Sequence, residues 1–75
     1  TPSRSLWVGN LDATITAPDI LNIFSPYGAI ESLRMLPDKE CVFVNFQQVE
    51  DALAAKEGMT GRKIGSSVVK LGFGK

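Results

Sequence analysis

The segment with the strongest strand pattern covers residues 39–46, and three successive positions on one of its sides are apolar. Val42, Val44 and Phe46 fall on that side, because side chains alternate between the two faces of a strand. A strand of this kind belongs to a sheet that is covered on one face and open on the other. We expect the side chains on the open face to be Lys39, Cys41, Phe43 and Asn45.

Three other segments also have the alternation and composition of strands. We expect these strands at residues 6–8, 30–36 and 68–73. The first uses Leu6 and Val8 for the core, which turns Trp7 outward. A shifted register would instead bury Trp7 and expose its two neighbours, which is less favourable. The same alternation predicts that Arg34, Lys70 and Gly72 also face outward.

Two segments between these strands have helical patterns. The first begins at Thr16 as N-cap, with Pro18 and Asp19 in the first turn, where a carboxylate suits the helix dipole. Its apolar stripe consists of Ile20, Ile23, Phe24 and Tyr27. The second segment extends from Val49 to about Met59, and glycines mark its end.

The resulting order, β-α-β-β-α-β, predicts an α+β fold of the ferredoxin-like sandwich type. In this fold a four-stranded antiparallel sheet carries both helices on one face. With 75 residues the chain has room for one domain, residues 1–75, which we expect to be one module of a longer protein.

Composition excludes several classes of function. The chain has one cysteine and no histidine, so a disulfide framework, a zinc site and histidine acid–base catalysis are all unavailable. We therefore expect no enzyme activity, no metal, no cofactor, no small-molecule substrate and no membrane span. Eight basic and eight acidic residues cancel, which argues against a partner held by a broad electrostatic field. An intracellular location is expected, with the cytoplasm favoured over the nucleus.

Taken over its full length, the chain resembles an RNA recognition motif (RRM). Residues 6–11, LWVGNL, look like the RNP2 motif, and residues 39–46, KECVFVNF, look like the RNP1 motif. The segments at residues 24–30 and 50–55 are also similar to the family. Among RRMs, the chain resembles those found beside pumilio-type repeats in fungal proteins.

The resemblance implies a role for each matching residue. Trp7 matches the RNP2 aromatic that stacks on a base, and Phe43 matches the RNP1 aromatic that contacts base or sugar. Lys39 matches the basic RNP1 residue that pairs with phosphate. Two positions depart from the family, since Cys41 stands where a third aromatic is usual and Glu40 where glycine is usual.

Two functions remain open at this point. The first is binding of single-stranded RNA, weak alone and acting with other domains in post-transcriptional mRNA regulation. The candidate RNA-binding residues are Trp7, Phe43, Lys39, Lys70, Arg34, Cys41, Asn45 and Gly72. The alternative is a protein-interaction RRM, a homodimer or a docking module, favoured by the zero net charge, by Glu40, and by Leu21 and Leu36 if these are exposed.

Overall fold

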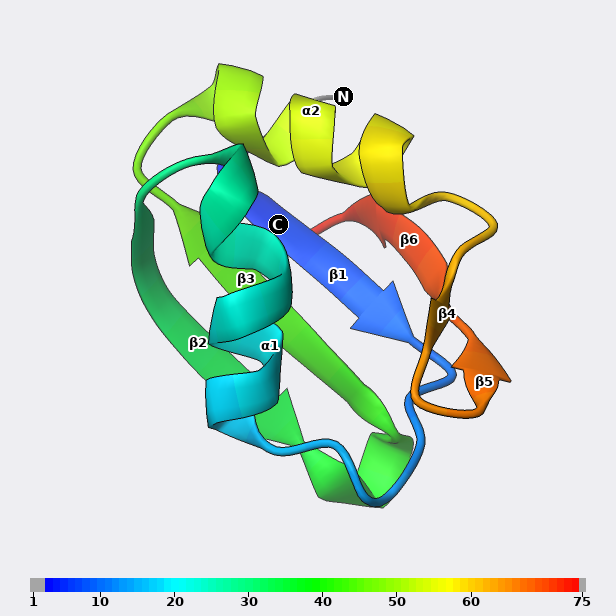
Figure 1. Cartoon of the computed structure of the whole chain (residues 1–75). Coiled ribbons are helices and arrows are strands. Elements are labelled where there is room, and N and C mark those ends of the chain that lie inside the picture. The colour runs from blue at the N-terminus through cyan, green and yellow to red at the C-terminus, as the bar shows by residue number, and fades with distance from the viewer. Residues whose placement is uncertain (1–2, 75) are drawn as a thin grey trace.

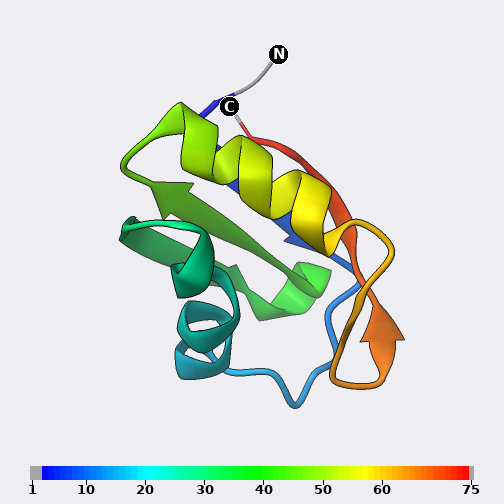
Figure 2. The same cartoon turned by 45° about the horizontal axis from the view of Figure 1, so that its top comes forward.

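A computed structural model of the chain describes residues 3–74 and has two layers (Figure 1). The strands of the main sheet are β1 (Ser5–Gly9), β2 (Ile30–Leu36), β3 (Cys41–Phe46) and β6 (Lys70–Phe73). They are antiparallel in the order β2-β3-β1-β6. Two helices, α1 (Ala17–Phe24) and α2 (Val49–Met59), lie on the same face of this sheet (Figure 2). The predicted fold class is therefore confirmed.

Cross-strand pairing determines which side chains share a face. Leu6 and Leu33 are both direct partners of Val44, so all three point to the helical face. Leu6 and Val44 are fully buried. The next residues along each strand point the other way, and Trp7 is accordingly paired with Phe43 on the open face. The orientation predicted for Trp7 is thus confirmed.

Helix α1 begins as the sequence predicts. The Asp19 carboxylate accepts hydrogen bonds from the N–H and the hydroxyl of Thr16, each at 3.0 Å, and these bonds fix the first turn. Ile20 and Phe24 are fully buried, and the Phe24 ring meets the Phe46 ring edge-on at 6.5 Å between centroids. A 3₁₀ turn, Ser25–Tyr27, then ends the helical segment.

Helix α2 contacts the sheet through small side chains. Ala52 and Ala55 are fully buried and Met59 is 7% exposed, so the helix axis can lie close to the strands. Val49, where we expected the helix to begin, is its first residue and is 37% exposed.

The last predicted strand, residues 68–73, is divided in the structure. Val68 belongs to a separate hairpin, in which β4 (Lys63–Ile64) pairs with β5 (Ser67–Val68). Gly65, with φ +67°, forms the turn, and Ile64 anchors the hairpin with 2% exposure. Lys63 is therefore a strand residue, although it is exposed.

Strand β3 is also shorter than predicted. A 3₁₀ turn, Pro37–Lys39, occupies its expected start, and Glu40 adopts φ +52° before pairing begins at Cys41.

No helix within residues 3–74 is long and apolar enough to cross a membrane.

Candidate nucleic-acid interface

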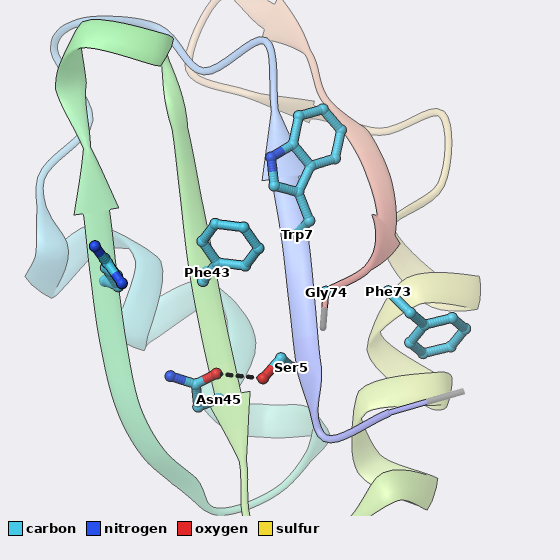
Figure 3. Close-up of a pocket in the computed structure, with 7 residues that line it drawn as sticks. Ser5, Trp7, Phe43, Asn45, Phe73 and Gly74 are labelled. Carbon is cyan, nitrogen blue, oxygen red and sulfur yellow. Dashed lines mark hydrogen bonds between the residues drawn. The ribbon is translucent and has the colours of Figure 1, made fainter. Parts of the chain in front are cut away.

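One row of side chains crosses all four strands on the open face. Arg34 of β2 is paired with Phe43 of β3, Phe43 with Trp7 of β1, and Trp7 with Gly72 of β6. Figure 3 shows both aromatic rings standing in front of the sheet. The structure therefore brings together a cation, two aromatic rings and a bare glycine, as the alternation predicted.

A glycine makes room for the Trp7 indole. A Cβ atom built on Gly9 would lie 2.2 Å from Cη2 of Trp7, which is closer than any real contact. The indole therefore lies directly over the Gly9 backbone, toward the end of β1. On the other side, a Cβ atom on Gly72 would lie 3.9 Å from Cε3 of Trp7, an ordinary contact distance.

A second glycine sits beside Phe43. A Cβ atom on Gly74 would lie 2.9 Å from Cδ1 and Cε1 of the Phe43 ring and 3.3 Å from Cβ of Ser5. The N–H of Gly74 donates to the carbonyl of Ser5 at 2.8 Å, which keeps the chain after β6 alongside β1. The Phe43 ring thus leans toward Gly74, whereas the Trp7 ring leans toward Gly9.

The two rings border a hollow of about 540 Å³ on the open face (Figure 3). Its lining residues are Ser5, Trp7, Arg34, Phe43, Asn45, Phe73 and Gly74. The Phe73 ring points away from the open face toward α2, where Lys56 Nζ lies 5.7 Å from its centroid. Phe73 is therefore not a third stacking surface beside Trp7 and Phe43.

Asn45 is held by hydrogen bonds from both neighbouring strands. Its Oδ1 accepts from the Ser5 hydroxyl at 2.6 Å, and its Nδ2 donates to Ser32 Oγ at 2.9 Å. Asn45 was among the predicted site residues, but neither serine was. Period-two spacing could have found both, because Ser5 precedes Trp7 by two positions and Ser32 precedes Arg34 by two.

The three predicted cations, Arg34, Lys70 and Lys39, lie at different positions relative to the hollow. Arg34 is exposed and lines the hollow. Lys70, also exposed, is paired with Gly9 and so lies at the end of the sheet toward which the indole leans. Lys39 is exposed in the turn before β3 and is not part of the lining of the hollow.

One predicted site residue, Cys41, is not available on the open face. It was expected on the open face, but its side chain is only 3% exposed. The loop after β1 crosses the start of β3, where the N–H of Leu11 donates to the carbonyl of Glu40 at 2.8 Å. Leu11 and Asp12 line a small cavity together with Cys41. The thiol is therefore covered and unavailable to a ligand on the sheet.

Asp12 stabilises the loop that covers Cys41. Its carboxylate accepts hydrogen bonds from the hydroxyl and N–H of Ser66 and from the N–H and hydroxyl of Thr14. These bonds, led by the one from the Ser66 hydroxyl, hold the pKa of the Asp12 carboxyl well below its usual value. Within residues 3–74, no three acidic or cysteine side chains are grouped to hold a metal ion.

Comparison with known families identifies this arrangement. The family model described as "RNA recognition motif" matches residues 6–70. The chain belongs to the RRM family. The row of Arg34, Phe43, Trp7 and Gly72 therefore lies on the RNP face of an RRM, where RNP1 and RNP2 are neighbouring strands.

Individual relatives agree with this assignment. The chain is 41% identical over 76 residues to a Pumilio domain-containing protein of Schizosaccharomyces pombe, covering 99% of this chain and 7% of that protein. It is 34% identical over 73 residues to a polyadenylate-binding protein of Arabidopsis thaliana, covering 97% and 18%. The RRM thus spans less than a fifth of either relative.

Solved structures share the fold closely. The first two RRM domains of the yeast poly(U) binding protein Pub1 match with a TM-score of 0.91 and 32% identity, over 96% of this chain and 46% of that one. The NONO-1 homodimer of C. elegans matches with a TM-score of 0.89 and 29% identity, over 96% of this chain and 29% of that one.

Proposed function

We propose that this RRM binds unpaired RNA across the hollow of its open face, with bases stacked on Trp7 and Phe43. The observation that carries the proposal is the cross-strand row in which Arg34, Phe43 and Trp7 are direct neighbours. Aromatic rings accept any base by stacking, and an adjacent guanidinium can meet the phosphate between stacked nucleotides. The opposite face of the sheet is covered by the two helices and offers no comparable stacking surface.

Binding by this module alone should be weak. Each base stacked on an aromatic ring contributes about 1–3 kcal/mol, and this face has two such rings. Cys41 stands where a third is usual in the family and is buried, so it adds nothing. We therefore expect a Kd in the micromolar range or weaker. A micromolar Kd corresponds to a binding free energy on the order of −8 kcal/mol, and weaker binding to a less negative value.

Weak RNA binding suits a module that works beside other domains. Linked sites gain affinity through effective concentration, so a second RNA-binding unit in the same protein would raise the total strongly. The relatives named above include a Pumilio domain-containing protein and a polyadenylate-binding protein. We infer a role in post-transcriptional mRNA regulation within the cell, as a binding module without catalysis.

The test is an NMR titration of the ¹⁵N-labelled chain with a pool of short single-stranded RNAs. We expect the shifted backbone amides to cluster at Trp7 and Phe43, which carry the rings, and at Arg34 and Lys70, which flank them. The variants Trp7→Ala and Phe43→Ala should each weaken binding about five- to hundredfold, the loss of one stacked base. Leu53→Ala, on the exposed side of α2, is the matched control and should bind as the wild type does.

Two results would contradict the proposal. One is the absence of any shift with the RNA pool at low salt, while spectra show an intact fold. The other is an equal loss of binding in Leu53→Ala and in the two aromatic variants, since a nonspecific surface would behave in that way. Thermal unfolding of each variant shows whether a loss of binding is a loss of folding.

A protein-interaction role is the second candidate. Leu21 on α1 is 42% exposed and Leu53 on α2 is 37% exposed, so the helical layer presents apolar side chains to solvent. Leu36, which the sequence also suggested, is only half-buried. One matching structure, NONO-1, is a homodimer. Sedimentation of the RNA-free chain over a range of concentrations tests self-association directly.

A further inference from the structure

We propose that Asn45 is the residue through which this open face discriminates between nucleobases, by pairing its outward amide edge, whose donor and acceptor are held in a fixed order, with a base edge that offers an acceptor and a donor in the matching order. The inference rests on the proposed RNA-binding function and deepens it. Stacking on Trp7 and Phe43 accepts every base, since each base has a π-face. Sequence preference therefore requires a fixed polar group next to the rings.

The backbone is arranged to bring a hydroxyl to each side of Asn45. Strand β2 has a register shift between Ile30 and Ser32, so that one extra residue is inserted opposite β3. Ile30 consequently stays opposite Phe46 on the core side, and Ser32 is the direct partner of Asn45 on the open face, in the same register as the rest of the β2–β3 pair. On the other side, Ser5 is the direct partner of Asn45 in β1.

These two serines fix the orientation of the amide. The Ser5 hydroxyl donates to Oδ1 at 2.6 Å, and Nδ2 donates to Ser32 Oγ at 2.9 Å. Figure 3 shows the amide oxygen turned toward Ser5 and the nitrogen turned away from it. The side chain is thus held between its neighbours before any ligand arrives, and binding costs little rotamer entropy.

Half of the hydrogen-bonding capacity of Asn45 remains free. An amide side chain has two N–H donors and two acceptor lone pairs on its oxygen. Ser5 uses one lone pair and Ser32 uses one N–H. Both serines are direct cross-strand partners of Asn45, so their hydroxyls approach the amide from its two sides, near the sheet. The remaining N–H and lone pair therefore lie on the outer edge, side by side.

That outer edge is within reach of a stacked base. Asn45 follows Phe43 by two positions on β3, about 7 Å along the strand, and both line the hollow. The Phe43 ring leans toward Gly74, which is also close to Ser5, the partner of Asn45. A base stacked on Phe43 would extend its hydrogen-bonding edge toward the amide. Such a bidentate amide–base pair discriminates between bases by about five- to hundredfold.

The experiment compares a panel of short RNAs that differ only in their central bases, which are all adenine, all cytosine, all guanine or all uracil. The wild type should prefer some members of the panel by at least about fivefold. Asn45→Ala should flatten these preferences while it keeps the stacking contribution to affinity. Asn22→Ala, an exposed amide on α1, is the matched control and should keep the wild-type ranking.

Asn45→Asp sharpens the test, because it replaces the outward donor with a second acceptor. Two adjacent acceptors match the two adjacent donors of guanine, N1–H and N2–H. This variant should bind more weakly overall, since it adds a negative charge, but its ranking should shift toward the guanine member. A purely structural role for Asn45 would lower all affinities together and leave the ranking unchanged.

The serines act as positioning residues and have their own readout. Ser32→Ala removes the acceptor that orients Nδ2. It should therefore reduce the ratio between the affinities for the preferred and the least preferred RNA of the panel more than it reduces the mean affinity. Ser32→Thr keeps a hydroxyl and should restore the ratio.

The outcomes separate this inference from the proposed function. If the wild type binds no RNA in the panel, the proposed function fails. If the wild type binds with preferences that persist in Asn45→Ala, the proposed function stands and the role of Asn45 is overturned. If the wild type binds all members of the panel equally, the role of Asn45 is also overturned.

Discussion

At the scale of single residues, the open face depends on missing side chains as much as on aromatic ones. Gly9 lies under the Trp7 indole, and Gly74 lies beside the Phe43 ring. In both places a Cβ atom would come within 3 Å of the ring. The rings can therefore lie close against the backbone and present one flat side to solvent, which is the geometry that base stacking requires.

Gly9→Ala should displace the indole without unfolding the domain. The added methyl group would collide with the far end of the Trp7 side chain, which stands on the surface and can rotate away. We expect a shift of Trp fluorescence emission in the free protein and a loss of RNA affinity approaching that of Trp7→Ala. Trp fluorescence and a binding titration measure the two effects.

Gly72→Ala is the matched control for this prediction. It adds the same methyl group on the other side of Trp7, at 3.9 Å from the ring, where ordinary contact is possible. The indole should keep its place and its emission. If the two alanine variants behave alike, the close approach at Gly9 does not determine the position of the ring.

Sequence reasoning could predict which way each side chain faces, but not how it lies. Period-two alternation correctly turned Trp7 and Phe43 outward, because burial of Leu6, Val8, Val42 and Val44 permits one register only. The tilt of each ring depends on a glycine, which is Gly9 in the same strand for Trp7 and Gly74, just after β6, for Phe43. Cys41, which the alternation turned outward, is buried in the structure, where the loop after β1 passes the start of β3.

At the scale of elements, Asp12 connects two segments that lie far apart in the sequence. Its carboxylate joins the loop after β1 to the turn of the β4–β5 hairpin, through hydrogen bonds from Thr14 and Ser66. Asn10 adds a bond in the same region, from Nδ2 to the carbonyl of Val68 at 2.7 Å. The hairpin is thereby fixed to the loop that covers Cys41.

The Asp12 connection should weaken at low pH. The folded state lowers the pKa of this carboxyl below its ordinary value of 3.8, so the bonds stabilise the fold above that pH. The stabilisation is lost progressively as the pH falls below 3.8 and the carboxylate is protonated. We expect the difference in Tm between wild type and Asp12→Asn to shrink over that range. Thermal unfolding followed by circular dichroism from neutral to acidic pH measures it.

Glu57→Gln, on the exposed side of α2, controls for the general effect of removing one negative charge. If the difference in Tm between wild type and Asp12→Asn stays constant at every pH, the charge of Asp12 contributes nothing to the connection.

The elements themselves were largely predictable. The capping residues Thr16 and Asp19 located the start of α1 and an apolar stripe located its length, while glycines marked the end of α2. The β4–β5 hairpin was missed because Ile64 is its only deeply buried residue, and two-residue strands have no detectable period. The register shift in β2 was missed for a related reason, since only pairing with β3 reveals the extra residue.

At the scale of the whole molecule, zero net charge leaves the open face to act through a few local cations. Long-range attraction of a polyanion requires a broad positive field, which eight basic and eight acidic residues do not produce. Arg34 and Lys70 flank the row of Trp7 and Phe43 at opposite edges of the sheet, on β2 and β6. Stacking should therefore dominate the binding energy, with phosphate contacts in a minor role.

This balance predicts a shallow dependence of RNA affinity on salt. Each phosphate contact with a single strand contributes about −0.7 to the slope of log Kobs against log salt concentration. Two contacts, from Arg34 and Lys70, give a slope of about −1.4. Arg34→Gln should halve the slope to about −0.7, while Lys63→Gln, in the hairpin outside the main sheet, should leave it unchanged. Titrations at several salt concentrations measure these slopes, and a wild-type value several times steeper would mean that electrostatic attraction, and not stacking, holds the RNA.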